Sequence, residues 1–339
     1  MKKSVLILGG AGFVGFNLLK TLAEKNIYKL SLADNFSRGK MDDSLSLLVE
    51  KYNIKVIKAD FTIPSSFDLL DNEYDQLYML AAVVGVNNTL ERPHEVIRIN
   101  TALIYNTLEW TKKAKIKKIL YTSTSECYAG TIEAFGYKVP TPEEIPLCIE
   151  DIAHPRFTYA VTKMLAESGF LNYSKKVGFE CTIVRYHNAF GPRMGFRHVI
   201  PHLVQRFLSN ESPFKIYGHD QTRSFSFISD SVDGTILAME SEKSNGEIYH
   251  IGSSEEISIE ELIKETGRLM NYNGKYENAP TYPGSVSRRC PDIAKAETQL
   301  GFKPKVNWKK GLKKTVRWYE EFYKTGVESF EKGFELPNN

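Results

Sequence analysis

A buried strand followed by a glycine turn is encoded in residues 3–16, Lys3-Ser-Val-Leu-Ile-Leu-Gly9-Gly-Ala-Gly12-Phe-Val-Gly15-Phe16. The uncharged run 4–8 is typical of a strand that is covered on both faces of a parallel sheet. The glycines then lead into a helix predicted from Phe13 to Glu24. In such a turn backbone amides approach a pyrophosphate, and the helix N-terminus adds unpaired N–H donors and a positive dipole. We therefore predict a dinucleotide site.

A plain tight turn would also need glycine, so the context of the motif matters. The next strand is predicted at 29–34 and ends in Asp34, about 20 residues past the glycines, where a carboxylate can accept hydrogen bonds from the adenosine ribose. A carboxylate there repels a 2′-phosphate, which favours NAD over NADP, although Arg38 and Lys40 soften that preference. The alternative interpretation is that Asp34 and Asn35 only start a turn.

The composition excludes several classes of protein. The chain has 339 residues, of which 25% are charged and 42% hydrophobic, as in an ordinary globular protein. A net charge of +3 with scattered basic residues gives no nucleic-acid surface. No apolar run is long enough to span a bilayer, so we expect a cytoplasmic protein with no membrane partner. The four cysteines have neither metal-ligand nor disulfide spacing, which predicts reduced thiols and no metal site.

Strands and helices alternate through the first half of the chain. Further strands are predicted at 54–60, 76–82, 118–123 and 180–186, and helices at 96–113 and 159–173. This alternation predicts an α/β fold with a Rossmann-type, doubly wound parallel sheet over residues 1–187. Residues 188–325 are less regular, and we expect them to form a smaller, mixed α/β substrate domain, part of which packs back on the sheet. Asp60, Phe61 and Leu80-Ala-Ala82 end their strands, where ligands bind in such sheets.

Tyr159 and Lys163 are spaced to lie on one face of a helix. A tyrosine with a pKa of about 10 is a poor base at neutral pH. A neighbouring ammonium and a cationic nicotinamide both favour the phenolate, so the pair suits removal of a proton from a sugar hydroxyl while hydride leaves for NAD. Tyrosine and lysine four residues apart are also common on helix surfaces; the preceding Ser123-Thr124 and the glycine turn favour the catalytic interpretation.

Taken together, these motifs resemble the extended short-chain dehydrogenase/reductases, the family of NAD-dependent nucleotide-sugar epimerases, dehydratases and decarboxylases. The resemblance covers residues 3 to about 322. Besides the glycine turn, it rests on Asp34, Asp60, Leu80-Ala-Ala82, Asn100, Thr122-Ser-Thr-Ser-Glu-Cys-Tyr128, Tyr159-x-x-x-Lys163, Arg185-Tyr-His-Asn188, Gly191-Pro-Arg193 and Gln221-Thr-Arg-Ser-Phe225.

The resemblance implies a tightly held NAD, a nucleoside-diphosphate sugar as substrate, and a homodimer formed through helices 96–113 and 159–173. The residues it implies in catalysis are Thr124, Glu126, Tyr159 and Lys163. Those implied in coenzyme binding are Gly9, Gly12, Phe13, Val14, Gly15, Asp34, Asn35, Asp60, Phe61, Leu80, Ala81, Ala82, Asn100, Thr122, Tyr159 and Lys163. Those implied in substrate binding are Val86, Thr124, Asn188, Val199, Tyr217, Arg223 and Arg288 or Arg289.

The reaction that follows oxidation at C4 is less clear from the motifs. Thr124-Ser-Glu126 is similar to the Thr-Ser-Glu of UDP-glucuronate decarboxylases and GDP-mannose dehydratases, which favours dehydration or decarboxylation assisted by Glu126. A 4-epimerase is the alternative, with Glu126 in a salt bridge outside the pocket. A non-catalytic nucleotide-binding protein and a reductase of small carbonyls are further alternatives. His187, expected beside the nicotinamide, and the long segment 130–142 depart from the family pattern.

Overall fold

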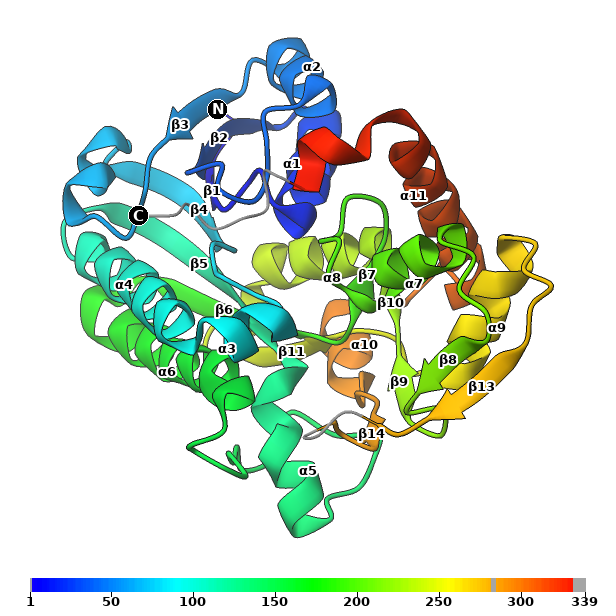
Figure 1. The fold of residues 1–339 in the computed structure, drawn as a ribbon. Coiled ribbons are helices and arrows are strands. Elements are labelled where there is room, and N and C mark those ends of the chain that lie inside the picture. The colour runs from blue at the N-terminus through cyan, green and yellow to red at the C-terminus, as the bar shows by residue number, and fades with distance from the viewer. Residues whose placement is uncertain (1, 282–284, 332–339) are drawn as a thin grey trace.

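The computed structural model describes residues 2–281 and 285–331 of the chain. Its centre is a seven-stranded parallel sheet (Figure 1). In sheet order the strands are β11 (Ile248–Ile251), β6 (Glu180–Tyr186), β5 (Lys115–Thr124), β4 (Glu73–Met79), β1 (Lys3–Leu8), β2 (Tyr28–Asp34) and β3 (Lys55–Lys58). Every neighbouring pair is parallel. The chain leaves β1 in one direction through β2 and β3 and in the other through β4 and β5. This reversal creates a crevice beyond the carboxyl ends of the strands.

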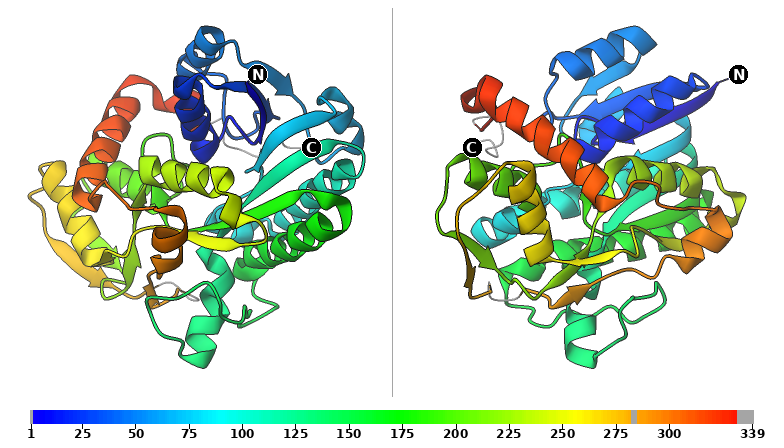
Figure 2. Two further views of the ribbon diagram at one scale, coloured as in Figure 1. Left: turned by 180° about the vertical axis from the view of Figure 1, so that it is seen from behind. Right: turned by 90° about the vertical axis from the view of Figure 1, so that its right-hand side faces the viewer.

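Helices cover both faces of the sheet, so the predicted doubly wound architecture is confirmed (Figure 2). The alternation of side chains along β1 explains its uncharged sequence. Val5 and Ile7 pack in one buried cluster with residues of α1 (Phe13–Lys25) and α8 (Ile228–Glu240). Leu6 and Leu8 pack in a second cluster with residues of α4 (Pro93–Thr111) and α6 (Thr158–Tyr173). These helices and the shorter ones beside them are α1 (Phe13–Lys25), α2 (Asp43–Tyr52), η1 (Pro64–Leu69), α3 (Val86–Glu91), α4 (Pro93–Thr111), η3 (Pro155–Phe157), α6 (Thr158–Tyr173), η4 (Ser174–Gly178), α8 (Ile228–Glu240) and η5 (Glu242–Ser244).

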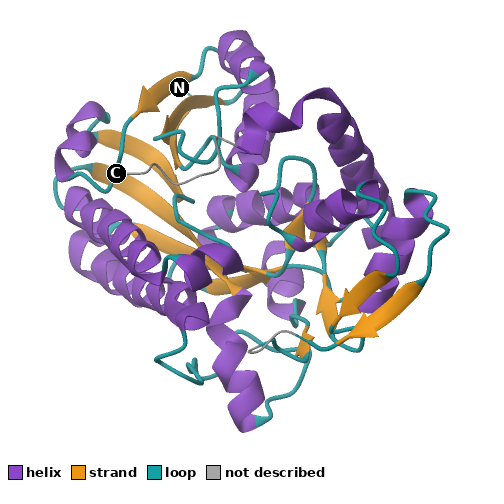
Figure 3. Ribbon diagram, viewed as in Figure 1, coloured by secondary structure: helices purple, strands orange, loops and turns teal. Residues whose placement is uncertain are grey.

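The second half of the chain contributes small sheets and the remaining helices, and Figure 3 shows its short strands grouped apart from the main sheet. The small sheets pair β10 (Ser226–Phe227) with β7 (Ala189–Phe190), β9 (Thr222–Ser224) with β12 (Glu256–Ser258) and β14 (Arg288–Arg289), and β13 (Tyr276–Ala279) with β8 (Phe214–Tyr217). The helices are α7 (Val199–Leu208), α9 (Ile259–Leu269), α10 (Ala294–Leu300) and α11 (Trp308–Glu331). Strand β11 and helix α8 belong to this half yet pack in and on the main sheet. The boundary at residues 187/188 stays a prediction.

The structure differs from the sequence prediction mainly in short elements. The long segment 130–142 is not simply a loop, because α5 (Ala129–Phe135) covers its first part, directly after η2 (Ser125–Tyr128). An isolated β-bridge joins Thr141 to Pro291. Two- and three-residue strands and a seven-residue helix carry too little periodicity to be predicted. Among the described residues, no helix combines the length and the apolar character that a membrane crossing requires.

Candidate active site

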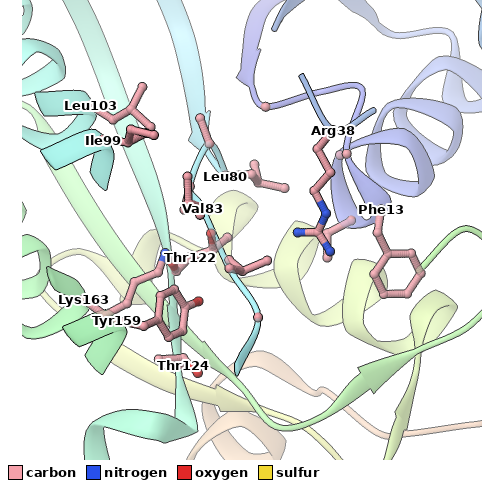
Figure 4. Close-up of a pocket in the computed structure, with 18 of the residues that line it drawn as sticks. Phe13, Arg38, Leu80, Val83, Ile99, Leu103, Thr122, Thr124, Tyr159 and Lys163 are labelled. Carbon is pink, nitrogen blue, oxygen red and sulfur yellow. Dashed lines mark hydrogen bonds between the residues drawn. The ribbon is translucent and has the colours of Figure 1, made fainter. Parts of the chain in front are cut away.

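A cavity of about 440 Å³ lies at the carboxyl ends of β1, β2, β4 and β5, in the crevice that the strand order creates. In Figure 4, Lys163, Tyr159 and Thr124 lie on one side of this cavity, and Arg38 and Phe13 lie on the other. We call the part lined by residues 9–15 and 33–39 the glycine end. The part lined by residues 122–126, 156–163 and Arg289 is the tyrosine end.

The glycine end is shaped by backbone that leaves no room for larger side chains. Gly9 has a φ of +85°, and a Cβ there would lie 2.7 Å from the backbone nitrogen of Ala81. A Cβ on Gly15 would lie 2.2 Å from the carbonyl oxygen of Gly9. Gly12 is different, because a Cβ there would have only the Gly9 oxygen within 4 Å, at 3.4 Å.

Gly12 is also the N-cap of α1, and it offers no side chain to the amides of the first turn. Residues 12–15 line the cavity. The free amides of this helix start, next to the open space at Gly12, fit the pyrophosphate of a dinucleotide.

Asp34 serves the turn and the cavity together. Its Oδ1 accepts a hydrogen bond from the backbone N–H of Phe36 (2.8 Å), and its Oδ2 accepts one from Ala11 (3.0 Å). Burial raises the pKa of Asp34, although these N–H donors oppose the rise. A carboxylate has about four acceptor positions, so Asp34 keeps acceptor capacity for ribose hydroxyls. The structure therefore shows the role of Asp34 in the turn, and its binding of the ribose stays a prediction.

Most of the other residues predicted to contact the coenzyme line the same cavity, namely Asn35, Asp60, Phe61, Leu80, Ala81, Ala82 and Thr122. Asn100 is not among the lining residues. Its Oδ1 accepts a hydrogen bond from the N–H of Val83 (2.7 Å), and its Nδ2 donates to the carbonyl of Val83 (3.1 Å). Because Val83 does line the cavity, Asn100 supports the wall from behind.

The tyrosine end brings the predicted catalytic groups together. Thr124 ends β5, and Tyr159 and Lys163 lie in the first two turns of α6. Thr124 and Tyr159 both line the cavity, and Thr124 acts to lower the pKa of the Tyr159 phenol. The Nζ of Lys163 donates to the carbonyl of Thr122 (2.7 Å) and lies 5.6 Å from the centre of the Tyr159 ring. The arrangement allows Tyr159 and Thr124 to contact one reacting oxygen.

Burial is the main cause of the pKa shifts at this end. It raises the pKa of Tyr159, and the nearby Arg38 guanidinium only partly offsets the rise. It lowers the pKa of Lys163 to about 8. The structure thus differs from the prediction that Lys163 lowers the pKa of Tyr159. Desolvation of the phenol outweighs the effect of neighbouring cations, and the Lys163 ammonium is bound to the Thr122 carbonyl.

Glu126 faces an excess of positive charge. Its Oε1 lies 2.5 Å from Nη1 of Arg289, and its Oε2 lies 4.0 Å from Nη2 of Arg156. Burial acts to raise the pKa of Glu126, but Arg289, Arg156 and Arg223 outweigh it and the pKa is lowered. The Nε of Arg156 is buried without a hydrogen-bond partner among the described residues. One carboxylate therefore offsets only part of the charge of three arginines, which leaves this end attractive to an anion.

Comparison with known proteins agrees with this geometry. The sequence model of the NAD dependent epimerase/dehydratase family matches residues 5–252. The chain belongs to this family. It is 36% identical to the UDP-N-acetyl-alpha-D-glucosaminuronate decarboxylase of Bacillus cytotoxicus over 331 residues, which cover 95% of the chain and 99% of that protein.

Two further relatives are informative. The chain is 31% identical to UDP-glucuronic acid decarboxylase 1 of Xenopus tropicalis, over 94% of the chain and 73% of that protein. Among solved structures, the UDP-glucuronic acid 4-epimerase of Bacillus cereus, in complex with UDP-glucuronic acid and NAD, superposes with a TM-score of 0.80 at 25% identity. That match covers 94% of the chain and 100% of the epimerase. The protein is thus an NAD-dependent enzyme of the extended short-chain dehydrogenase/reductase type.

Not all of the predicted substrate residues of this epimerase/dehydratase line the cavity. Val86, Asn188 and Arg289 do, together with Thr124. Arg288 lies 2.7 Å from Glu256, and about half of its side chain is exposed. Arg223 donates to the carbonyls of Val286 (2.6 Å) and Ser287 (3.2 Å). The residues outside the lining are Val199, Tyr217, Arg223 and Arg288, and their roles stay predictions.

His187 does not have the position expected of it. It is 1% exposed, is absent from the cavity lining, and lies 4.6 Å from the ring of His250. Neither of its ring nitrogens has a hydrogen-bond partner among the described residues. Burial and three nearby cationic or titratable groups hold its pKa well below the usual value, so a neutral imidazole packs behind the site.

Several lining residues were not predicted as site residues. Arg156 lies three residues before Tyr159, so the helical repeat was a signal that it shares a face with this predicted catalytic residue. The sequence indicates a role for Arg38 only in coenzyme preference, whereas the structure places it in the cavity lining. Tyr186 ends β6 two residues before Asn188, so its place at a strand end was a signal for the cavity. No sequence motif singles out His198, although it adjoins Val199.

Proposed function

We propose that this epimerase/dehydratase decarboxylates a nucleoside-diphosphate uronic acid through a 4-keto intermediate. The observation that carries the proposal is the pairing of Glu126 with Arg289, with Arg156 next to them, at the end of the cavity that holds Tyr159. A sugar carboxylate would supply the missing negative charge. The similarity to two uronate decarboxylases supports this choice.

The first step is oxidation at C4 of the sugar. NAD held by the glycine end of the cavity would supply the acceptor for the C4 hydride and the donor that later returns it. Tyr159 takes the proton of the C4 hydroxyl, and Thr124 donates a hydrogen bond that holds the reacting oxygen. Burial raises the pKa of Tyr159 in the chain without coenzyme, so the phenolate that takes this proton would depend on the positive charge of bound NAD. The phenol formed in this step then returns the proton to the C4 oxygen in the last step.

The second step breaks the bond between C5 and C6. A carboxylate at C5 is β to a C4 ketone, so CO₂ leaves and the electron pair moves onto C5 and the C4 oxygen as an enolate. Arg156 and Arg289 hold the carboxylate before cleavage. Glu126 is ionised at neutral pH because its pKa is lowered, so it relays a solvent proton to C5 rather than storing one.

The reaction is tested by mass and NMR analysis of products from UDP-glucuronate, UDP-N-acetylglucosaminuronate, UDP-glucose and dTDP-glucose. We expect loss of CO₂ from a uronate and no net loss of NAD. Loss of water from a neutral hexose would contradict the proposal. A Glu126→Gln variant should still reduce NAD with the uronate but release CO₂ at least about tenfold more slowly; an unchanged rate would remove Glu126 from the mechanism.

A uronate 4-epimerase is a second candidate. It is favoured by the structural match to the UDP-glucuronic acid 4-epimerase of Bacillus cereus. The same arginines would hold a carboxylate that stays on the sugar. The product then has the mass of the substrate and an inverted C4 signal by NMR, so the two reactions are separated by one experiment.

We also propose that the enzyme is a homodimer through α4 and α6. These helices pack against each other on one face of the sheet. Ile97 and Tyr105 of α4 and Leu165 of α6 are each about half exposed, which is unusual for large apolar side chains on neighbouring helices. Light scattering on the wild type and on a Tyr105→Glu, Leu165→Glu double variant tests this contact, with a monomer expected for the variant.

A further inference from the structure

Two polar contacts join opposite walls of the cavity at its glycine end. One wall is the segment 34–42 after β2, and the other is the segment 191–198 before α7. A guanidinium nitrogen (Nη2) of Arg38 donates to Nε2 of His198 at 3.2 Å. Nη1 of Arg193 lies 2.8 Å from Oδ2 of Asp42. Both Arg38 and His198 line the cavity, so these contacts connect the walls where the coenzyme is expected to lie.

The contact with His198 leaves the charge of Arg38 uncompensated. Arginine can only donate, so Nε2 of His198 must accept and the imidazole is neutral. Burial, with Arg38 itself, lowers the pKa of His198 to about 3, which agrees with this assignment. No carboxylate among the described residues lies within salt-bridge distance of Arg38. A desolvated guanidinium facing a cavity needs an anion, and its planar fork suits phosphate oxygens.

The Asp42–Arg193 pair is built into packed structure. The Arg193 guanidinium lies 3.9 Å from the ring centre of Phe16 in α1, the helix that begins at the glycine turn. Its side chain is 16% exposed and that of Asp42 is 29% exposed, so solvent screens the pair less than it would a surface pair. The hydroxyl of Tyr319 donates to the carbonyl of the next residue, Met194. The segment 191–198 is therefore anchored on α1, on α2 and on α11.

We propose that Arg38, His198, Asp42 and Arg193 form a clasp that retains NAD through the catalytic cycle. Arg38 binds the pyrophosphate of the coenzyme, and the Asp42–Arg193 pair fixes the segment that carries His198. An enzyme that takes a hydride and returns it to the same sugar has to keep its coenzyme between the two steps. The clasp concerns coenzyme retention and is independent of which reaction the sugar undergoes.

The rate of NAD release tests the clasp directly. Full-length protein loaded with radiolabelled NAD is chased with unlabelled NAD and sampled by gel filtration. We expect Arg38→Gln to release NAD about tenfold faster or more, because a hydrogen bond to a charged group is lost. Asp42 also caps α2, where its Oδ1 accepts from the N–H of Leu45 at 3.0 Å. Asp42→Asn keeps a capping side chain and removes only the charge.

The ion pair predicts a specific relation among variants. Asp42→Asn and Arg193→Gln should each release NAD several-fold faster. The double variant should release it no faster than the quicker single variant, because both changes remove one interaction. Additive effects of the two changes would mean that Asp42 and Arg193 act separately, which contradicts the clasp.

Arg206 provides a matched control. Its guanidinium lies 2.6 Å from Glu211 and 4.1 Å from the ring centre of Phe214, and its side chain is 14% exposed. It therefore resembles Arg193 in packing and pairing, and like Arg193 it does not itself line the cavity. Its segment contributes no lining residue, whereas the segment 191–198 contributes Met194 and His198. Arg206→Gln should lower the melting temperature as Arg193→Gln does and leave NAD release unchanged. Equal release from both variants, or wild-type retention in Arg38→Gln, would overturn the proposal.

Discussion

The two ends of the cavity are built by different means. At the glycine end one continuous unit, β1 followed by α1, presents backbone amides, and Gly9 and Gly15 are needed because neighbouring backbone lies within 3 Å of any Cβ. At the tyrosine end the working groups are side chains from η2, η3, α6 and β14. Glu126 and Arg289 meet there although 163 residues separate them.

The difference predicts that the two ends fail in different ways. The glycine end depends on shape, so a single added methyl group should disturb it. The tyrosine end depends on charge and on proton transfer, so substitutions that keep the shape but remove a functional atom should stop the reaction while the coenzyme stays bound.

The largest effect is expected from Tyr159→Phe. The change removes one oxygen and leaves the ring packed beside Lys163. Loss of a positioned general base lowers kcat by about a thousandfold. NAD content after gel filtration should equal that of the wild type, since no backbone at the glycine end changes. Parental activity in this variant would show that another group takes the C4 proton.

The next largest effect separates two neighbouring arginines. Arg289 is 5% exposed and paired with Glu126, whereas Arg288 is about half exposed and paired with Glu256. Arg289→Gln leaves the partly buried carboxylate of Glu126 without its main partner, and we expect kcat/KM to fall about a hundredfold. Arg288→Gln should change it by less than about threefold. If kcat/KM fell equally in both variants, the loss would be due to a disturbance of β14 as a whole and not to the pairing of Arg289 with Glu126.

The same difference explains what could be predicted from the sequence. The sheet, the glycine turn, Asp34 and the Tyr159–Lys163 pair follow from local spacing, since strand-end geometry is common to all doubly wound sheets. The ordered family motifs added Thr124 and Glu126. The partners of Glu126 could not be predicted, because contacts between distant loops depend on the packing of the second half of the chain. Asn100 was predicted to contact the coenzyme, but it hydrogen-bonds Val83 behind the cavity wall. The sequence alone does not distinguish a side chain that lines a cavity from one that supports its wall.

Two glycine variants test the prediction that the glycine end depends on its shape. Gly15→Ala places a Cβ 2.2 Å from the carbonyl oxygen of Gly9, so it should lower the melting temperature and weaken NAD binding. Gly12→Ala meets only one atom, at 3.4 Å, and its φ is −69°. The fold should therefore keep its stability, while the methyl group occupies space at the helix start and weakens NAD binding about tenfold. Calorimetry measures the melting temperature, and titration measures NAD binding. Unchanged NAD binding in Gly12→Ala would contradict the assignment of that space to the coenzyme.

The smallest effect is a pH dependence at the tyrosine end. Burial lowers the pKa of Lys163 from 10.5 to about 8, so its ammonium is present below that pH and is lost above it. We expect kcat to fall by up to about tenfold per pH unit above pH 8. Loss of folded protein does not explain the fall in kcat. Between about pH 8 and 10.5 Lys163 carries a proton in the unfolded chain but not in the folded chain, so the contribution of Lys163 to the free energy of unfolding increases with pH. Lys163→Arg should be slower at pH 7 but lose the alkaline fall, since arginine stays charged. If kcat of Lys163→Arg still fell above the same pH, the fall would be due to the titration of a different group.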